Sequence, residues 1–534
     1  MNSTAKNPYH LPRTIWVVVA SALLLSAGIH LFEPTGDSGL DNVLKAALWM
    51  LAAITFGIWF VFFGPAARKT RFGSLAAVVS ILVIFFTVFR VDSFSGSMVP
   101  GFSLRFSRSA DRALEVTPSE TTTAAIADLG TTTPWDFPQF LGPERDVSVS
   151  AVELDRDWDT TPPELLWRQP IGAGWSSFAV VNGYAVTMEQ RGEREMVTCY
   201  DVDTGELVWT WSIANRFEDV VAGTGPRATP TIDDGWVYAL TNSGLLVALN
   251  GTDGSQIWEQ DLRAQYSGTP QQDRAALPYG RSNSPLILGS LVISPAGGIE
   301  GRGFTSLVAF DKKSGEKIWE GGNHQISMSS PAAASLAGVD QVLIVNEGFA
   351  SGHDAESGVQ LWEYPWPGLT GSDASVSQAV PIPPNRVWLS KGYSVGAALL
   401  ELTAGPGGQF TVTELWSSSR VLRTKFSQVT ILDGYAYGLS EGVLECVEMQ
   451  TGERVWKHGR YHHGQILRVH DLLLVLSEEG EVVLVEATPD RADNVLGRFQ
   501  AIEGKTWNNF ALYGPYLAVR NAQEAAVFRL PLEN

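Results

Sequence analysis

Cysteine is scarce in this chain: there are 2 among 534 residues, Cys199 and Cys446. Neither belongs to a Cys-x-x-Cys pair, so the sequence offers no zinc spacing and no thioredoxin-type redox motif. Each stands two positions before the acidic residue of a repeated phrase, where other repeats carry Ala248 and Ala309. We interpret both cysteines as small buried core residues and expect no disulfide between them.

Basic residues are in the minority, with 38 Lys and Arg against 57 Asp and Glu. Residues 1–92 carry seven basic and four acidic side chains, which leaves 31 basic and 53 acidic ones, a formal charge of −22, for residues 93–534. This excess of negative charge argues against nucleic acid and anionic lipid headgroups as partners of the larger region.

Signatures of catalysis are sparse as well. The sequence has no P-loop and no His-Glu-x-x-His motif. The segment Gly392–Gly396 matches a nucleophile elbow in spelling, but a strand rather than a helix is expected after it. Four histidines lie within 458–470, and we interpret the run Lys457–Gly464 as a solvated loop rather than a metal site. The sequence therefore predicts no catalytic and no metal-binding residues.

A nine-residue phrase occurs five times, at Asp201–Trp209, Asn250–Trp258, Asp311–Trp319, Asp354–Trp362 and Glu448–Trp456. It begins with Asp, Asn or Glu, has Gly at its fifth position and ends with Trp. The first residue and the glycine are typical of a tight hairpin turn. Asn-Gly and Asp-Gly pairs between apolar runs, as at Asn182-Gly183 and Asp433-Gly434, predict further hairpins. Each repeat is therefore expected to form four antiparallel strands, the size of a propeller blade.

The number of outermost strands gives the number of blades. Aromatic residues mark seven such strands, at Trp209, Trp258, Trp319, Trp362, Trp416, Trp456 and Phe499. Only three strands are expected after Phe499, and Leu165–Arg168 precedes the first blade without a blade of its own. We predict an all-β, eight-bladed β-propeller of four-stranded antiparallel blades in which this early strand completes the last blade. Trp167 and the six outer-strand tryptophans are expected to dock neighbouring blades.

The first 92 residues contain three apolar runs, each near the ~20 residues needed to cross a bilayer. They predict a three-helix transmembrane anchor with helices at about 15–32, 43–63 and 74–91. Basic residues precede the first run and lie between the second and third, whereas the first loop is acidic. The positive-inside rule then places the N-terminus in the cytoplasm and everything after Arg90 on the other side. Residues 93–133, rich in Ser, Thr and Ala, are predicted to be a flexible linker, with the propeller at 134–534.

At the level of fold the chain resembles the PQQ-like β-propeller repeat family. The resemblance rests on Trp135–Pro143, Gly225–Pro230, Asp311–Trp319, Lys391–Leu399 and Val485–Pro489, and it covers about residues 134–534. The family includes pyrroloquinoline-quinone (PQQ) alcohol and glucose dehydrogenases and the propeller lipoprotein of the outer-membrane β-barrel assembly machinery. The dehydrogenases typically carry an adjacent cysteine pair, a calcium site of Glu, Asn and Asp, and a catalytic Asp. This sequence has no adjacent cysteines.

One group of residues is left as a candidate ligand site. Basic side chains stand just before the innermost strands of four blades, at Arg227, Arg281, Lys425 and Lys505. The loops that lead into these strands share one face of a propeller, so the cations are expected at one mouth of the channel. They would hold an anionic ligand or an acidic peptide, or else form salt bridges with nearby turn carboxylates.

These features favour a multi-pass protein of the bacterial inner membrane whose propeller faces the periplasm. We expect a non-catalytic binding or scaffolding module for envelope proteins or peptides that needs no cofactor. The alternatives are a membrane-bound dehydrogenase of alcohols or sugars that uses PQQ and calcium, and a sensor of a small anion.

Overall fold

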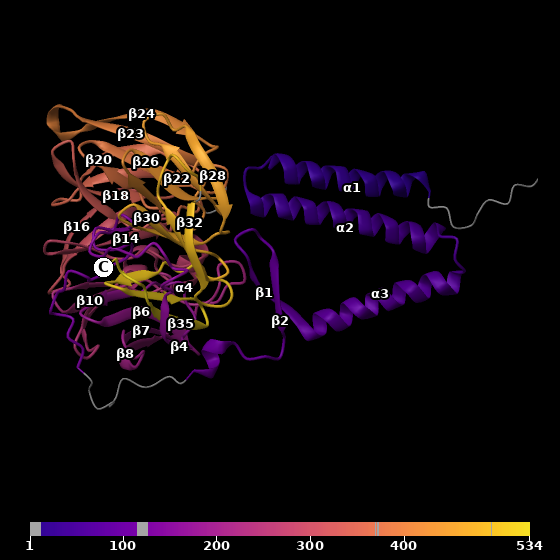
Figure 1. Ribbon diagram of the computed structural model, residues 1–534, viewed down its shortest axis with the longest axis horizontal. Coiled ribbons are helices and arrows are strands. Elements are labelled where there is room, and N and C mark those ends of the chain that lie inside the picture. Colours follow the sequence, from indigo (N-terminus) through magenta and orange to yellow (C-terminus); the bar gives the residue numbers. More distant parts are fainter. Residues whose placement is uncertain (1–11, 115–125, 369, 371–372, 493, 534) are drawn as a thin grey trace, which may run out of the picture. The chain divides into compact units, whose positions relative to one another are not determined.

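The computed structural model describes residues 12–114, 126–368, 370, 373–492 and 494–533. The chain divides into two compact units, Met1–Arg108 and Ser109–Asn534. The first unit is built on helices and the second on strands (Figure 1).

Three helices dominate the first unit: α1 (Arg13–Phe32), α2 (Ser38–Phe63) and α3 (Arg68–Val88). All three are long and apolar enough to cross a membrane. Helix α2 begins five residues before the predicted 43, because the Asp37 carboxylate caps it by accepting the Leu40 N–H (2.8 Å). Helix α3 also begins earlier than predicted, at Arg68, and ends at Val88 rather than 91.

A hairpin follows α3 directly, where the sequence led us to expect the end of a helix and then a linker. Its strands are β1 (Phe89–Phe94) and β2 (Pro100–Leu104). Asn42 near the start of α2 donates to the carbonyl of Ser97 in the hairpin turn (2.9 Å). The hairpin thus joins the end of α3 to the start of α2.

The remaining part of the predicted linker contains one short 3₁₀ helix, η1 (Ala110–Ala113), which belongs to the second unit. The buried Asp111 carboxylate pairs with Arg216 across 2.7 Å. Arg112 lies 2.6 Å from Glu193. Residues 109–114 are therefore held against the first blade, and residues 115–125 of the predicted linker lie outside the described residues.

The second unit is an eight-bladed β-propeller of four-stranded antiparallel blades, as predicted. In blades 1 to 7 the four blade strands follow one another in chain order from the channel outward. Blades 1 and 2 are β5 (Ala179–Val181), β6 (Tyr184–Arg191), β7 (Arg194–Asp201), β8 (Leu207–Ala214), and β9 (Thr231–Asp233), β10 (Trp236–Leu240), β11 (Leu245–Asn250), β12 (Gln256–Asp261). Blades 3 and 4 are β13 (Leu286–Leu288), β14 (Leu291–Ile299), β15 (Gly303–Asp311), β16 (Lys317–Gly321), and β17 (Ala332–Leu336), β18 (Val339–Val345), β19 (Phe349–Asp354), β20 (Gln360–Pro365).

Blades 5 and 6 are β21 (Val380–Ile382), β22 (Arg386–Lys391), β23 (Gly396–Ala404), β24 (Phe410–Ser418), and β25 (Val429–Leu432), β26 (Tyr435–Ser440), β27 (Val443–Glu448), β28 (Arg454–Arg460). Blade 7 is β29 (Gln465–Val469), β30 (Leu472–Leu476), β31 (Glu481–Glu486), β32 (Asn494–Gln500), and blade 8 begins with β33 (Ala511–Tyr513), β34 (Tyr516–Arg520), β35 (Glu524–Arg529). Connections between the described strands of the blades contain three short helices, η2 (Arg263–Ser267), α4 (Pro270–Ala276) and η3 (Pro406–Gly408).

The ring closes through β4 (Glu164–Pro170), which pairs antiparallel with β35 as the fourth strand of blade 8. This confirms the predicted closure by Leu165–Arg168. A strand from the start of the propeller covers an edge that would otherwise be left unpaired.

The repeated phrase forms the joint between blades. In the first phrase the Asp201 carboxylate accepts the Thr204 N–H (2.8 Å), and Gly205 adopts a φ of +76°. The ring of Trp167, from the preceding blade, lies directly on Gly205, where a Cβ would come within 2.8 Å of it. Its Nε1 donates to the Val202 carbonyl (2.7 Å).

The same arrangement recurs around the ring. Tryptophans that lie on the phrase glycine of the next blade are Trp167, Trp209, Trp258, Trp319 and Trp416. Those that donate Nε1 to a carbonyl of the next blade are Trp167, Trp209, Trp258, Trp416 and Trp456. Trp362 instead donates to Gln341 of its own blade (2.7 Å).

A segment that the strand pattern did not predict runs along the inner strands and occupies the channel. We call residues 137–149 the plug. Phe137 exchanges two backbone hydrogen bonds with Val180 of blade 1, each 2.8 Å. The strand β3 (Ser148–Val149) pairs in parallel with the innermost strand of blade 7, on its channel side. The plug therefore includes residues 137–143 of the family-like segment Trp135–Pro143.

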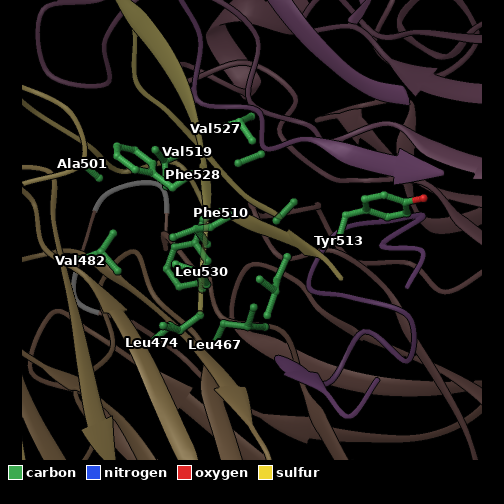
Figure 2. Close-up of a cluster of buried hydrophobic side chains, with 14 of the residues drawn as sticks. Leu467, Leu474, Val482, Ala501, Phe510, Tyr513, Val519, Val527, Phe528 and Leu530 are labelled. Carbon is green, nitrogen blue, oxygen red and sulfur yellow. The ribbon is translucent and has the colours of Figure 1, made fainter. Parts of the chain in front are cut away.

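The largest hydrophobic core lies where the chain closes on itself. Figure 2 shows side chains of blades 7 and 8, among them Leu467, Leu474, Phe510 and Phe528, gathered into one cluster. The plug residues Phe137 and Val149 belong to the same core. Closure of the ring and filling of the channel are thus stabilised by one buried apolar surface.

Candidate ligand site at the channel mouth

The innermost strands all begin at one end of the propeller, because each antiparallel blade is traversed from the channel outward. We call this end the mouth. The four predicted cations lie in the loops that enter β9, β13, β25 and β33. They stand four to six residues before these strands, so they are not equivalent positions and their side chains have different surroundings.

Arg281 is buried in the wall of the propeller. Its Nη2 pairs with Asp273 across 2.9 Å, and its Nη1 donates to the Ala296 carbonyl (2.6 Å). Burial lowers the pKa of this guanidinium, with the Asp273 charge acting in the opposite direction. These contacts are those of a structural ion pair.

Arg227 is half-buried and lies over the ring of Phe217, with its guanidinium carbon 4.7 Å from the ring centre. Arg274 approaches the same ring to 4.2 Å. Arg227 also donates to the Ala222 carbonyl (2.7 Å), and burial lowers its pKa to about 10. This cation, too, has intramolecular partners.

The two lysines contact aromatic rings. The Lys425 ammonium, nearly buried, lies 5.1 Å from the ring centre of Tyr393. The Lys505 ammonium lies 4.3 Å from the ring of Trp507 and 5.3 Å from that of Trp175. Contacts of this kind are attractive because the ring face carries partial negative charge.

Two of these rings, Trp175 and Trp507, form an aromatic cluster with Phe426 and His463 that the sequence analysis did not predict. Trp507 is 5.0 Å from Trp175 and 4.6 Å from Phe426, and Phe426 is 5.7 Å from His463, all between ring centres. The cluster joins the mouth loops of blades 1, 6, 7 and 8. The sequence feature that could have predicted this cluster is tryptophan outside the repeated phrase. Trp175 and Trp507 each stand four residues before an innermost strand.

His463 corrects one expectation. We interpreted the run 457–464 as a solvated loop, but its first four residues belong to β28. His463, in the loop that follows, is only 3% exposed, and its pKa lies well below the usual value because of burial. Its N–H donates to Glu478 (3.2 Å), which also accepts the Trp507 Nε1–H (2.9 Å). The loop is thus partly a wall of the aromatic cluster.

Two buried amides hold the cluster in place. Asn508 donates to the carbonyls on either side of Trp175, Gly174 (3.1 Å) and Ser176 (2.8 Å). Gln465 donates to the carbonyls of Phe426 (3.0 Å) and Trp507 (2.7 Å). Since each amide nitrogen faces carbonyls, its orientation is fixed. Within the part of the chain that the structure describes, no donor reaches Asn508 Oδ1 or Gln465 Oε1.

One group of side chains near the mouth has metal-ligand character. The ligand atoms of His462, Glu478 and Glu479 lie within 4.8 Å of one another. His462 and Glu479 approach to 3.7 Å, an ion-pair distance, and burial raises the pKa of Glu479. The ion pair accounts for their proximity without a metal.

Other reactive side chains lie away from the mouth. Cys199 and Cys446 are buried in β7 and β27 of different blades and are not joined. The Ser351 Oγ lies 3.0 Å from His353 Nε2, but both residues are completely buried and the other ring nitrogen contacts the Gly358 carbonyl. Burial lowers the pKa of His353 to about 4. This pair has neither solvent access nor an orienting carboxylate, so it is structural.

A pocket of about 300 Å³ lies at the opposite end of the propeller, lined by Glu153, Leu154, Arg156, Val469, His470, Asp471, Leu472 and Glu533. Arg156 contacts three carboxylates there, those of Asp471, Glu486 and Glu533. The predicted cations and the aromatic cluster are all at the mouth instead.

Comparison with known proteins finds one matching family model and similar dehydrogenase sequences. A family model described as outer membrane protein assembly factor BamB matches residues 193–458. The dehydrogenase subunit of the quinone alcohol dehydrogenase of Gluconobacter oxydans is 24% identical over 343 residues. That match covers 59% of this chain and 42% of the subunit, so the chain spans less than half of that relative.

Two solved structures are similar to this chain at low identity. The quinohemoprotein alcohol dehydrogenase of Comamonas testosteroni has a TM-score of 0.50 at 12% identity, covering 76% of this chain and 82% of that one. BamB of Moraxella catarrhalis has a TM-score of 0.47 at 18% identity, covering 69% of this chain and all of that one. The repeats of this eight-bladed β-propeller are therefore similar to those of the PQQ-like β-propeller family over the residues that the family model matches.

Proposed function

We propose that this protein is a non-catalytic binding or scaffolding module of the bacterial cell envelope. Its three apolar helices would anchor it in the inner membrane, with the N-terminus in the cytoplasm and the propeller in the periplasm. The basic residues before α1 and between α2 and α3 support this orientation. Its partners would be envelope proteins or peptides, with a small anion as the alternative ligand.

The observation that carries this proposal is the one-sided construction of the propeller. The plug occupies the channel from the far side, while the mouth presents aromatic rings held by buried amides. Aromatic residues on a rigid scaffold are typical anchors of protein–protein interfaces, since they bury large areas at low entropic cost.

The residues present do not fit the quinone and calcium of the dehydrogenases. The two cysteines lie in different blades, so they cannot form the adjacent pair expected over the quinone. The described group with metal-ligand character includes His462, whereas calcium takes oxygen ligands. These points favour a propeller that has the fold of the dehydrogenases but not their quinone and calcium sites.

Site-specific crosslinking would test the proposal in the full chain, in its membrane. A photo-crosslinking residue at Arg420, an exposed position in the mouth loop before β25, should yield discrete adducts with envelope proteins. The same residue at Lys313, exposed in a turn at the opposite end, is the matched control and should yield none. Equal patterns from both positions, or no adducts from Arg420 and further mouth positions, would contradict the proposal.

The second candidate, a PQQ-dependent dehydrogenase, is supported by the sequence match to the quinone alcohol dehydrogenase subunit. The purified full chain would be mixed with quinone and calcium, and its absorption spectrum and dye-linked oxidation of alcohols and sugars measured. We expect neither a bound-quinone spectrum nor activity. Turnover that depends on both additions would replace the binding function with this one.

A further inference from the structure

Lys505 lies where a cationic ligand would bind. Its ammonium is within 4.3 and 5.3 Å of two tryptophan ring centres, and these rings are 5.0 Å apart at an angle of 37°. Two or more aromatic faces around one ammonium form the arrangement by which proteins recognise alkylammonium groups. Here the chain supplies the ammonium itself, from the same loop that carries Trp507.

Two buried amides hold the loops that carry the two rings. The Asn508 amide nitrogen donates to the two carbonyls that flank Trp175, and the Gln465 amide nitrogen donates to the Trp507 carbonyl. The amide oxygens of both residues are buried. Both residues are at most 1% exposed. The two amides therefore fix the backbone on both sides of the rings, which keeps the ring faces in place around the ammonium.

Charge favours a cation as well. The region from residue 93 onward carries a formal charge of −22, which raises the local concentration of cations near its surface. The Glu478 carboxylate, bonded to the Trp507 indole, is the acidic group next to the rings. Arg281 and Arg227 are engaged in the wall, so they do not make the mouth an anion site.

We propose that Trp175 and Trp507 form an ammonium cage at the mouth, in which Lys505 is a resident occupant that a lysine-type side chain of the partner displaces. The incoming ammonium would take the position of the Lys505 ammonium, against the faces of both rings. This inference rests on the proposed binding function and specifies its ligand. The partner would present a basic rather than an acidic side chain.

The test uses the full chain in detergent and a small probe, Nα-acetyl-lysine methylamide, with binding measured by saturation-transfer NMR and calorimetry. Lys505 competes with the probe at high effective concentration, so wild-type binding should be weak. Lys505→Ala vacates the cage and should tighten binding about tenfold, in the range that cation–π contacts contribute. Lys505→Arg refills the cage and should leave the affinity at the wild-type level.

Two controls separate the cage from simpler effects. The Nε-acetylated probe keeps the chain length but has no charge, and should bind no variant more tightly than another. Loss of repulsion between cations is screened by salt, whereas vacating the cage is not, so the gain should persist at high ionic strength. Adding Trp507→Leu, or Trp175→Leu if the first variant unfolds, to Lys505→Ala should abolish the gain.

Equal probe affinity in wild type and Lys505→Ala, equal binding of the charged and acetylated probes, or a gain that vanishes in salt would each overturn the cage. None of these results bears on crosslinking from the mouth, so the cage can fail while the binding function stands.

Discussion

The guanidinium of Arg145 donates from Nη1 to the carbonyl oxygen of Pro285 across 2.9 Å, inside the channel. Its Nη2 donates to the Ser284 carbonyl (3.2 Å), and its own carbonyl accepts a hydrogen bond from Gln378. One plug residue therefore ties blade 3 to blade 5. The plug is thus part of the closed propeller and not a loose N-terminal extension.

Replacing Arg145 with Met should destabilise the propeller, since two buried carbonyls would lose their donors at a cost of about 1–3 kcal/mol. Thermal and denaturant unfolding of the full chain, followed by tryptophan fluorescence, would measure the loss. Arg529→Met is the control, because its pair with Glu164 is 48% and 63% exposed and such pairs contribute about 0–1 kcal/mol. Equal losses in the two variants would mean that the plug carries no stability.

Gly254 should tolerate no side chain. Its φ is +73°, and a Cβ would come within 2.5 Å of the Trp209 ring. Gly254→Ala should therefore cost more than the roughly 1–2 kcal/mol of a left-handed non-glycine residue. Gly183→Ala is matched to it, with a φ of +81° but no atom within 4 Å of the added Cβ, and should cost only the backbone strain. A similar loss of melting temperature in both would show that the tryptophan–glycine contact between blades is not tight.

Glu195 should make stability depend on pH. It is buried, accepts hydrogen bonds from Asn242 N and Asn215 Nδ2 (both 2.6 Å), and burial raises its pKa from 4.5 to about 7. Between these pH values the folded chain holds a proton that the unfolded chain has lost. The free energy of unfolding should therefore fall as pH rises from about 4.5 to 7, by at most about 1.4 kcal/mol per unit.

Glu195→Gln should flatten this slope, measured as melting temperature against pH. Glu347, whose pKa burial also raises to about 7, will keep a second part of the slope. Glu347→Gln alone should remove this second part of the slope, and the double variant should have a flatter slope than either single variant. An unchanged slope in Glu195→Gln would mean that this carboxyl titrates normally.

The blades were predictable because their signals are local. The Asp201 turn, the positive φ of Gly205 and the Trp of the next strand all lie within one nine-residue phrase, and the phrase recurs. Closure by Leu165–Arg168 followed from counting strands, since a ring leaves no unpaired edge.

The plug and the aromatic cluster were not predictable in this way. Arg145 meets Ser284 139 residues further along the chain, and Asn508 meets Ser176 332 residues away. Such contacts exist only after the ring has closed, and the plug has no alternation that marks it as channel-filling. The cations were placed at the mouth by topology, but burial and stacking, which decide what they contact, depend on neighbours from other blades.

Removing β4 tests the closure directly. Deleting residues 164–170 should expose the edge of β35 and lower the melting temperature strongly or cause aggregation, because an unpaired edge strand recruits other chains. Light scattering and thermal unfolding would detect either result. Deleting 406–408, in the connection between β23 and β24, is the control and should leave both nearly unchanged. Normal stability without β4 would require another strand to complete blade 8.

The orientation of the anchor can be tested with reporter fusions whose positions follow from the helix bounds. A fusion within α3, for example after Gly73, would interrupt a span, so the informative sites are after Gly64, between α2 and α3, and after Arg108, at the end of the first unit. The basic residues near Gly64 should hold that site in the cytoplasm, where alkaline phosphatase is inactive. The Arg108 fusion should be active.

Moving positive charge into the α1–α2 turn, as in Asp37→Lys with Asp41→Lys, should reduce the difference in activity between the two fusions, because short-loop Lys and Arg set the orientation. Equal alkaline phosphatase activity in the Gly64 and Arg108 fusions would place both sites on the same side, and would mean that α3 does not cross the membrane.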